Sequence, residues 1–120
     1  MLNRIIVFVG LFISLQVMAQ GAQSDVLDQV TFKKEISKKG IQLIDVRTPE
    51  EFNAGHIPNA ININFMASDF KTQISKLNKN KAVYVYCQAG GRSAKASKMF
   101  LENGFKEVHD LKGGYGAWKE

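Results

Sequence analysis

Cysteine is nearly absent from this sequence: Cys87 is the only one in 120 residues. A single cysteine cannot form an internal disulfide, so a disulfide-stabilised scaffold is excluded. It cannot build a structural zinc site alone either, and His56 and His109 have no metal-ligand spacing to it. We therefore expect no metal site, and Cys87 is either a buried apolar side chain or a reactive thiol.

The sequence also lacks internal repeats, low-complexity segments and any cluster of arginines with aromatic residues. Its lysines are scattered and the net charge is only +5, so nucleic-acid binding is not expected. Such a mildly basic surface can still draw small anions towards a site. Hydrophobic residues make up 45% and charged residues 22%, which is typical of one globular domain at this length.

The N-terminal segment has the pattern of a signal peptide. Arg4 precedes an apolar run from Ile5 to Leu15, and Val17 and Ala19 suit a signal-peptidase cut before Gln20. The alternative is an uncleaved membrane anchor, but about 20 apolar residues are needed to span a bilayer and this run is shorter. We predict a signal peptide over residues 1–19, one domain over 20–120, only transient membrane contact, and a periplasmic or secreted protein with net charge +4.

Helical and strand-like segments alternate along the rest of the chain. Residues 20–29 are polar and predicted to be a loose lead-in. Strands are predicted at 41–46, 60–64, 82–86 and 106–111, and helices at 30–40, 48–55, 67–80 and 93–104, with a closing helical turn at 113–120. This alternation predicts an α/β fold with a mainly parallel sheet, in which ligands bind beyond the carboxyl ends of the strands.

Cys87 lies where such a site is expected, at the end of the most strand-like segment. Gly90 and Gly91 permit positive φ, so the following loop can turn its N–H groups inward to form an anion nest. A helix beginning at Ser93 adds its free N–H groups, and Arg92 adds a permanent positive charge. All of these favour a thiolate at Cys87, whereas a side chain pointing into the core would have a raised pKa.

The chain resembles the single-domain rhodanese, or sulfurtransferase, family in three segments: "LIDVRTPEEFNAGHIPNAINI", "VYCQAGGRSAKAS" and "LKGGYGAWKE". The resemblance implies a rhodanese-like three-layer α/β fold, with a central parallel sheet of about five strands flanked by helices. It also implies that the Cys87 thiolate takes sulfane sulfur from thiosulfate or a persulfide donor. The Cys87 persulfide then passes that sulfur to a thiophilic acceptor, such as a thiol that a protein can carry, without a metal or organic cofactor.

The resemblance makes Cys87 the catalytic residue and the following loop its substrate-binding cradle: Gln88, Ala89, Gly90, Gly91, Arg92 and Ser93. In this reading the backbone amides hold the anion, and Arg92 helps to orient the donor. Four residues separate Cys87 from Arg92. Related cysteine phosphatases and arsenate reductases have five, so these activities are the less favoured alternatives. A non-catalytic sulfur carrier or redox-partner-binding module is the main alternative.

Other residues of the three segments are expected to be structural. Asp45 and Arg47 are predicted to form an ion pair at the strand end, and His56 to make a structural hydrogen bond. His109 is predicted at the surface or a strand edge, and Gly113, Gly114 and Trp118 are predicted to serve packing. Gln88 and Ala89 stand where some relatives carry arginine or lysine, which favours a donor less charged than thiosulfate.

Overall fold

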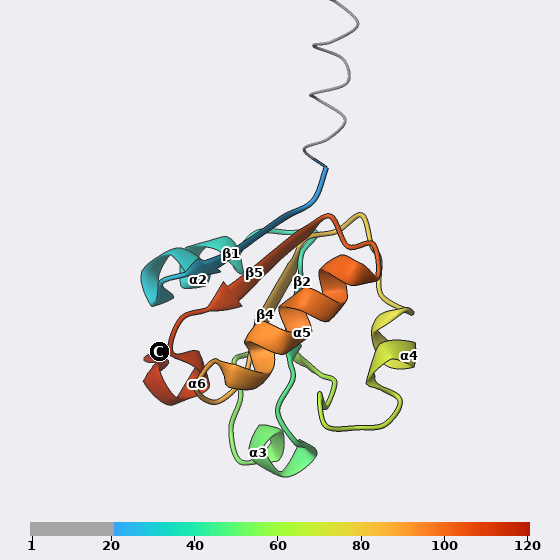
Figure 1. Cartoon of the computed structure of the whole chain (residues 1–120). Coiled ribbons are helices and arrows are strands. Elements are labelled where there is room, and N and C mark those ends of the chain that lie inside the picture. Colours follow the sequence, from blue (N-terminus) through green and yellow to red (C-terminus); the bar gives the residue numbers. More distant parts are fainter. Residues whose placement is uncertain (1–20) are drawn as a thin grey trace, which may run out of the picture.

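The computed structural model describes residues 21–120, so the predicted signal peptide lies outside the described residues. Five parallel strands form one sheet in the order β1-β5-β4-β2-β3 (Figure 1). Their bounds are β1 Gln23–Leu27, β2 Gln42–Asp45, β3 Ile61–Asn62, β4 Val83–Tyr86 and β5 Glu107–Leu111. The predicted α/β fold with a five-stranded parallel sheet is confirmed.

Helices cover both faces of this sheet (Figure 1). Their bounds are α2 Gln29–Glu35, α3 Pro49–Asn53, α4 Phe70–Ile74, α5 Gly91–Glu102 and α6 Gly114–Ala117. On one face, Phe70 of α4 and Phe100 of α5 pack against the β-sheet valines of a single core cluster. On the other, Phe32 of α2 packs with Tyr84 and Tyr86 of β4. Among the described residues, none of the helices has the length and apolarity to cross a membrane.

Local sequence accounts for the two elements that flank the site. All four residues of β4 are buried, as expected for a central strand with helices on both faces. The start of α3 is a capping box: the Thr48 hydroxyl accepts from the Glu51 N–H, and the Glu51 carboxylate accepts from the Thr48 N–H. Pro49 occupies the first turn, where its missing N–H costs nothing.

Several predicted segments are corrected by the structure. The loose lead-in is wrong, because residues 23–27 form β1, which pairs in parallel with β5. The first four residues of β1 are exposed, so this edge strand shows no hydrophobic alternation and is held by backbone pairing. The helices predicted at 30–40 and 67–80 are shorter than expected, at seven and five residues.

His109 lies inside the sheet rather than at a strand edge, because β5 runs between β1 and β4. Its ring packs 4.7 Å from the Tyr84 ring and its two nitrogens contact the carboxylates of Asp25 and Glu107. None of these four residues belongs to the Cys87 loop, and His109 is the middle residue of β5.

Candidate functional site

Cys87 follows β4 directly and is buried, with 1% of its surface exposed. Its Sγ nevertheless faces the loop: it accepts a hydrogen bond from the Gly90 N–H at 2.9 Å and lies 3.4 Å from the Ser93 hydroxyl. The predicted loop therefore does wrap around the sulfur. Although Cys87 is buried, it is therefore not merely an apolar core residue, because its sulfur is hydrogen-bonded within the loop.

The electrostatics of the loop favour the thiolate. Burial raises the pKa of the Cys87 thiol, but hydrogen bonds from the Ser93 hydroxyl and from the N–H groups of Ser93, Gly90 and Ala89 lower it by more. The net pKa lies below the usual value for cysteine. Burial and hydrogen bonding thus shift the pKa of the same thiol in opposite directions, and the hydrogen bonds have the larger effect.

One glycine makes this geometry possible. Gly90 precedes α5 with a left-handed φ of 115°, which directs its N–H at the sulfur. Gly91, which was also expected to use positive φ, is instead the first residue of α5. The helix therefore begins two residues before Ser93, and Ser93 becomes a buried side chain of its first turn.

Arg92 has a partner that sequence reasoning did not identify. Its guanidinium binds the Glu51 carboxylate through two hydrogen bonds, of 2.7 and 3.0 Å. This contact lowers the pKa of Glu51 to about 2, so the pair is ionised at neutral pH. Because Glu51 belongs to α3 and Arg92 to α5, the pair ties the two helices together beside the Cys87 loop.

The predicted ion pair between Asp45 and Arg47 is present and buried. Arg47 Nε and Nη2 donate to the Asp45 carboxylate at 3.0 and 2.7 Å, and Nη2 also donates to the Gly55 carbonyl. The remaining nitrogen, Nη1, donates to the Gln88 side-chain oxygen at 3.1 Å. The pair thus fixes the first residue of the loop as well as the end of β2.

Backbone N–H groups of α6 also bind the Cys87 loop. The N–H of Tyr115 donates to the Cys87 carbonyl at 2.8 Å, and that of Gly116 donates to the Gln88 carbonyl at 2.9 Å. Gly114 has φ +61°, and a Cβ there would lie 2.6 Å from the Cys87 carbonyl oxygen. The predicted packing role of Gly114 is therefore explained by this close approach.

A cavity of about 340 Å³ opens beside the loop. It is lined by Arg47, Glu51, Ala54, Gly55, Gln88 and Tyr115. These residues come from α3, from the segments following β2 and β4, and from α6. The cavity therefore lies between the Cys87 loop and α3, the helix that contains Glu51.

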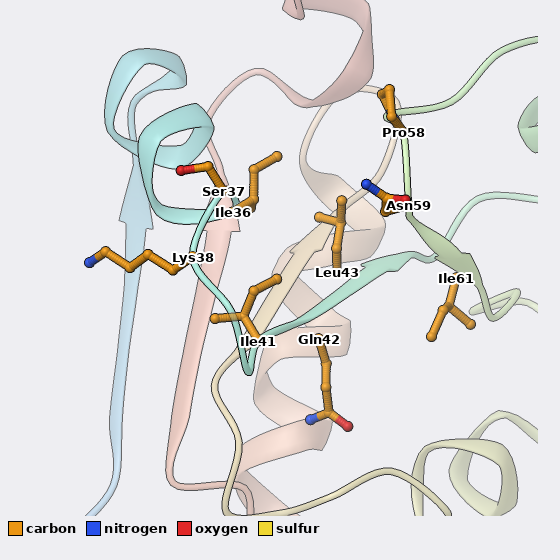
Figure 2. A pocket seen from close by; sticks show the side chains of 9 residues that line it. All are labelled: Ile36, Ser37, Lys38, Ile41, Gln42, Leu43, Pro58, Asn59 and Ile61. Atoms are coloured by element: carbon orange, nitrogen blue, oxygen red, sulfur yellow. The ribbon is translucent and has the colours of Figure 1, made fainter.

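A separate hollow of about 360 Å³ lies between the end of α2, the start of β2 and β3 (Figure 2). Its lining is Ile36, Ser37, Lys38, Ile41, Gln42, Leu43, Pro58, Asn59 and Ile61. It includes none of the Cys87 loop residues and no thiol, carboxylate or imidazole.

His56 has the structural role that was predicted for it. Its Nδ1 lies 2.9 Å from the Phe52 carbonyl oxygen, and its ring stacks on the Phe52 ring at 3.7 Å between centroids. Within residues 21–120, histidine, cysteine and acidic side chains form no group that could hold a metal ion.

Replacing Ser93 with alanine tests the thiolate geometry. Loss of the hydroxyl that contacts Cys87 Sγ should raise the thiol pKa, because that hydrogen bond lowers it in the wild type. The pH dependence of Cys87 alkylation by iodoacetamide measures this pKa. Ser97→Ala is the matched control, because the Ser97 hydroxyl donates to the Ser93 carbonyl one turn further along and does not contact the sulfur. Equal pKa values in all three proteins would contradict the assigned hydrogen bond.

Comparisons with known proteins agree with this architecture. A family profile described as "Rhodanese-like domain" matches residues 28–120. Among solved structures, a rhodanese-like domain protein from Staphylococcus aureus superposes with a TM-score of 0.70 at 32% identity, covering 80% of this chain and 92% of that one.

Several relatives carry names that state an activity. "Thiosulfate sulfurtransferase 16, chloroplastic" of Arabidopsis thaliana is 42% identical, over 74% of this chain and 82% of its own length. "Thiosulfate sulfurtransferase GlpE" of Coxiella burnetii is 34% identical, over 70% of this chain and 77% of its own length. Four other relatives are longer, and the chain spans only 55% to 61% of their length.

Proposed function

Since this chain belongs to the rhodanese-like family, we propose that it is a sulfurtransferase in which Cys87 carries the transferred sulfur as a persulfide. The observation that carries the proposal is the position of Cys87 Sγ, buried within a loop whose Gly90 N–H donates to it and whose Ser93 hydroxyl lies in hydrogen-bond contact with it. Two relatives named thiosulfate sulfurtransferase support the same activity.

The first half-reaction is a displacement at sulfur. The Cys87 thiolate attacks the outer sulfur of thiosulfate or of a persulfide donor and forms a new S–S bond. The donor's own bond to that sulfur breaks, and its electron pair leaves with sulfite or with the donor thiolate. The product is a Cys87 persulfide whose negative charge lies among the loop N–H groups and the N-terminus of α5.

The second half-reaction returns the thiolate. A thiolate acceptor, or cyanide in an assay, attacks the outer sulfur of the persulfide. The S–S bond to Cys87 breaks, and its electron pair remains on Cys87. Because the same N–H groups stabilise both the thiolate and the persulfide anion, the loop serves both steps without rearrangement.

We propose further that the protein acts outside the cytoplasm, with residues 1–19 removed before Gln20. The support is the charge and hydrophobicity pattern of that segment. Intact mass of the protein recovered from the periplasm or medium tests this. A chain beginning at Gln20 is the expected result, and a full-length chain in the membrane fraction would favour the anchor.

Intact-mass measurement after treatment with thiosulfate and desalting tests the transfer chemistry. We expect the protein to gain one sulfur atom, which cyanide then removes. Sulfate is the matched control, since it has a similar size and charge but no sulfane sulfur. Loading by a donor without steady-state turnover would favour the carrier alternative, and no loading by thiosulfate or by a persulfide donor would contradict the proposal.

A further inference from the structure

The charged side chains at the mouth of the site are paired with each other. Arg92 binds Glu51, and Arg47 binds Asp45. The Asp45–Arg47 pair is buried, whereas the side chains of Arg92 and Glu51 keep 27% and 31% of their surface exposed. The two ion pairs together contribute no net charge, so the Cys87 thiolate leaves the loop region with a net negative charge.

Arg92 is electrostatically coupled to the sulfur as well as to Glu51. The hydrogen bonding that Arg92 donates to the Glu51 carboxylate is the main cause that raises the pKa of Arg92, and the negative charge of Cys87 also contributes. Glu51 itself lines the cavity beside the loop. A ligand entering this cavity therefore meets the Glu51 carboxylate and Arg47, whose charge Asp45 balances, while the charge of Arg92 beside the cavity is balanced by Glu51 itself.

We propose that Glu51 determines the class of sulfur donor, by neutralising Arg92 and so disfavouring dianions. This rests on the proposed sulfurtransferase function and names its substrate class. Alkyl persulfides and monoanionic thiosulfonates are the favoured donors, and the thiosulfate dianion is a poor one. The physical reason is that each additional negative charge on the donor is repelled by the thiolate, while Arg47 and Arg92 are already paired with carboxylates.

Glu51→Gln removes this charge with little change in shape. The Glu51 side chain accepts from the Thr48 N–H and hydroxyl, both at 3.1 Å, in the capping box of α3. Glutamine also forms capping boxes, so the start of the helix is preserved. Glu50→Gln is the matched control, because Glu50 is the preceding, exposed residue of α3 and is not the partner of Arg92.

Alkylation of Cys87 measures the local charge independently of sulfur transfer. Iodoacetate and iodoacetamide are nearly the same size, and only the first is an anion. The ratio of their rates therefore cancels changes in thiol pKa and in access. We expect E51Q to raise the iodoacetate-to-iodoacetamide ratio about fivefold at low ionic strength. The increase should shrink in concentrated salt, and E50Q should change the ratio by less than about twofold.

Donor selectivity measures the functional consequence. The kcat/KM for thiosulfate divided by that for methanethiosulfonate, a monoanion, should also rise about fivefold in E51Q, mainly through KM. A merely structural role for Glu51 would lower both values together and leave their ratio unchanged.

The two measurements separate the inference from the proposed function. A raised alkylation ratio in a protein that accepts sulfur from neither donor would overturn the sulfurtransferase proposal, and the donor preference with it. Sulfur loading with alkylation and donor ratios that are the same in wild type and E51Q would overturn the role of Glu51 alone. Equal increases in E51Q and E50Q would also overturn it, because the effect would then not depend on the contact with Arg92.

Discussion

Cys87→Ser is expected to abolish sulfur transfer, with a loss of at least ~10⁴-fold in turnover. A serine hydroxyl is not ionised at neutral pH and cannot hold the sulfur as a persulfide. The fold should survive, because α6 binds the backbone carbonyl at this position rather than the side chain. Steady-state transfer from a sulfur donor to cyanide is the measurement, with thermal unfolding as the control for folding.

The same variant distinguishes an enzyme from a carrier. A wild type that gains one sulfur but shows no steady-state turnover would favour the carrier alternative. In that case loading is the only activity that Cys87→Ser can abolish. Substantial turnover in a well-folded Cys87→Ser protein would contradict the assignment of Cys87 as the nucleophile. The only thiol in the chain would then be dispensable for the reaction.

Arg47→Met is expected to have the largest effect on stability, lowering the free energy of unfolding by about 3–5 kcal/mol. Methionine leaves the Asp45 carboxylate in the interior without its partner, where its relative exposure is 0%. It also removes the donors to the Gly55 carbonyl and to the Gln88 side chain. Chemical denaturation measures the change. The change is a large part of the total free energy of unfolding, which is about 5–15 kcal/mol for native proteins.

The double variant Asp45→Asn/Arg47→Met is the control for that interpretation. Removing both charges avoids an isolated buried carboxylate, so the double variant should be at least ~1 kcal/mol more stable than Arg47→Met alone. If the double variant is the less stable of the two, the main role of Arg47 is its hydrogen bonding to Gly55 and Gln88. The buried charge pair would then not be the cause.

The centre of the site could be predicted from sequence because its signals are local. A continuous apolar run predicts β4, and the glycines after Cys87 predict a loop that turns its N–H groups towards the sulfur. The start of α3 is similarly encoded by Thr48, Pro49 and Glu51 within four residues. In each case the residues that interact are close neighbours along the chain.

The tertiary structure decided the features whose partners are distant in sequence. β1 has few apolar residues facing a core and exists because its backbone pairs with β5, more than 80 residues away. Glu51 and Arg92 are 41 residues apart, so sequence could show an acidic first turn and a loop arginine but not that they bind each other. The sequence by itself therefore determined where the cysteine stands, at the end of β4, and the loop whose N–H groups face its sulfur, through local backbone and capping preferences. Only the packing of α3, α5 and α6 around that loop decided which charges remain free to meet a substrate, because Coulomb interactions and hydrogen bonds depend on distance in space.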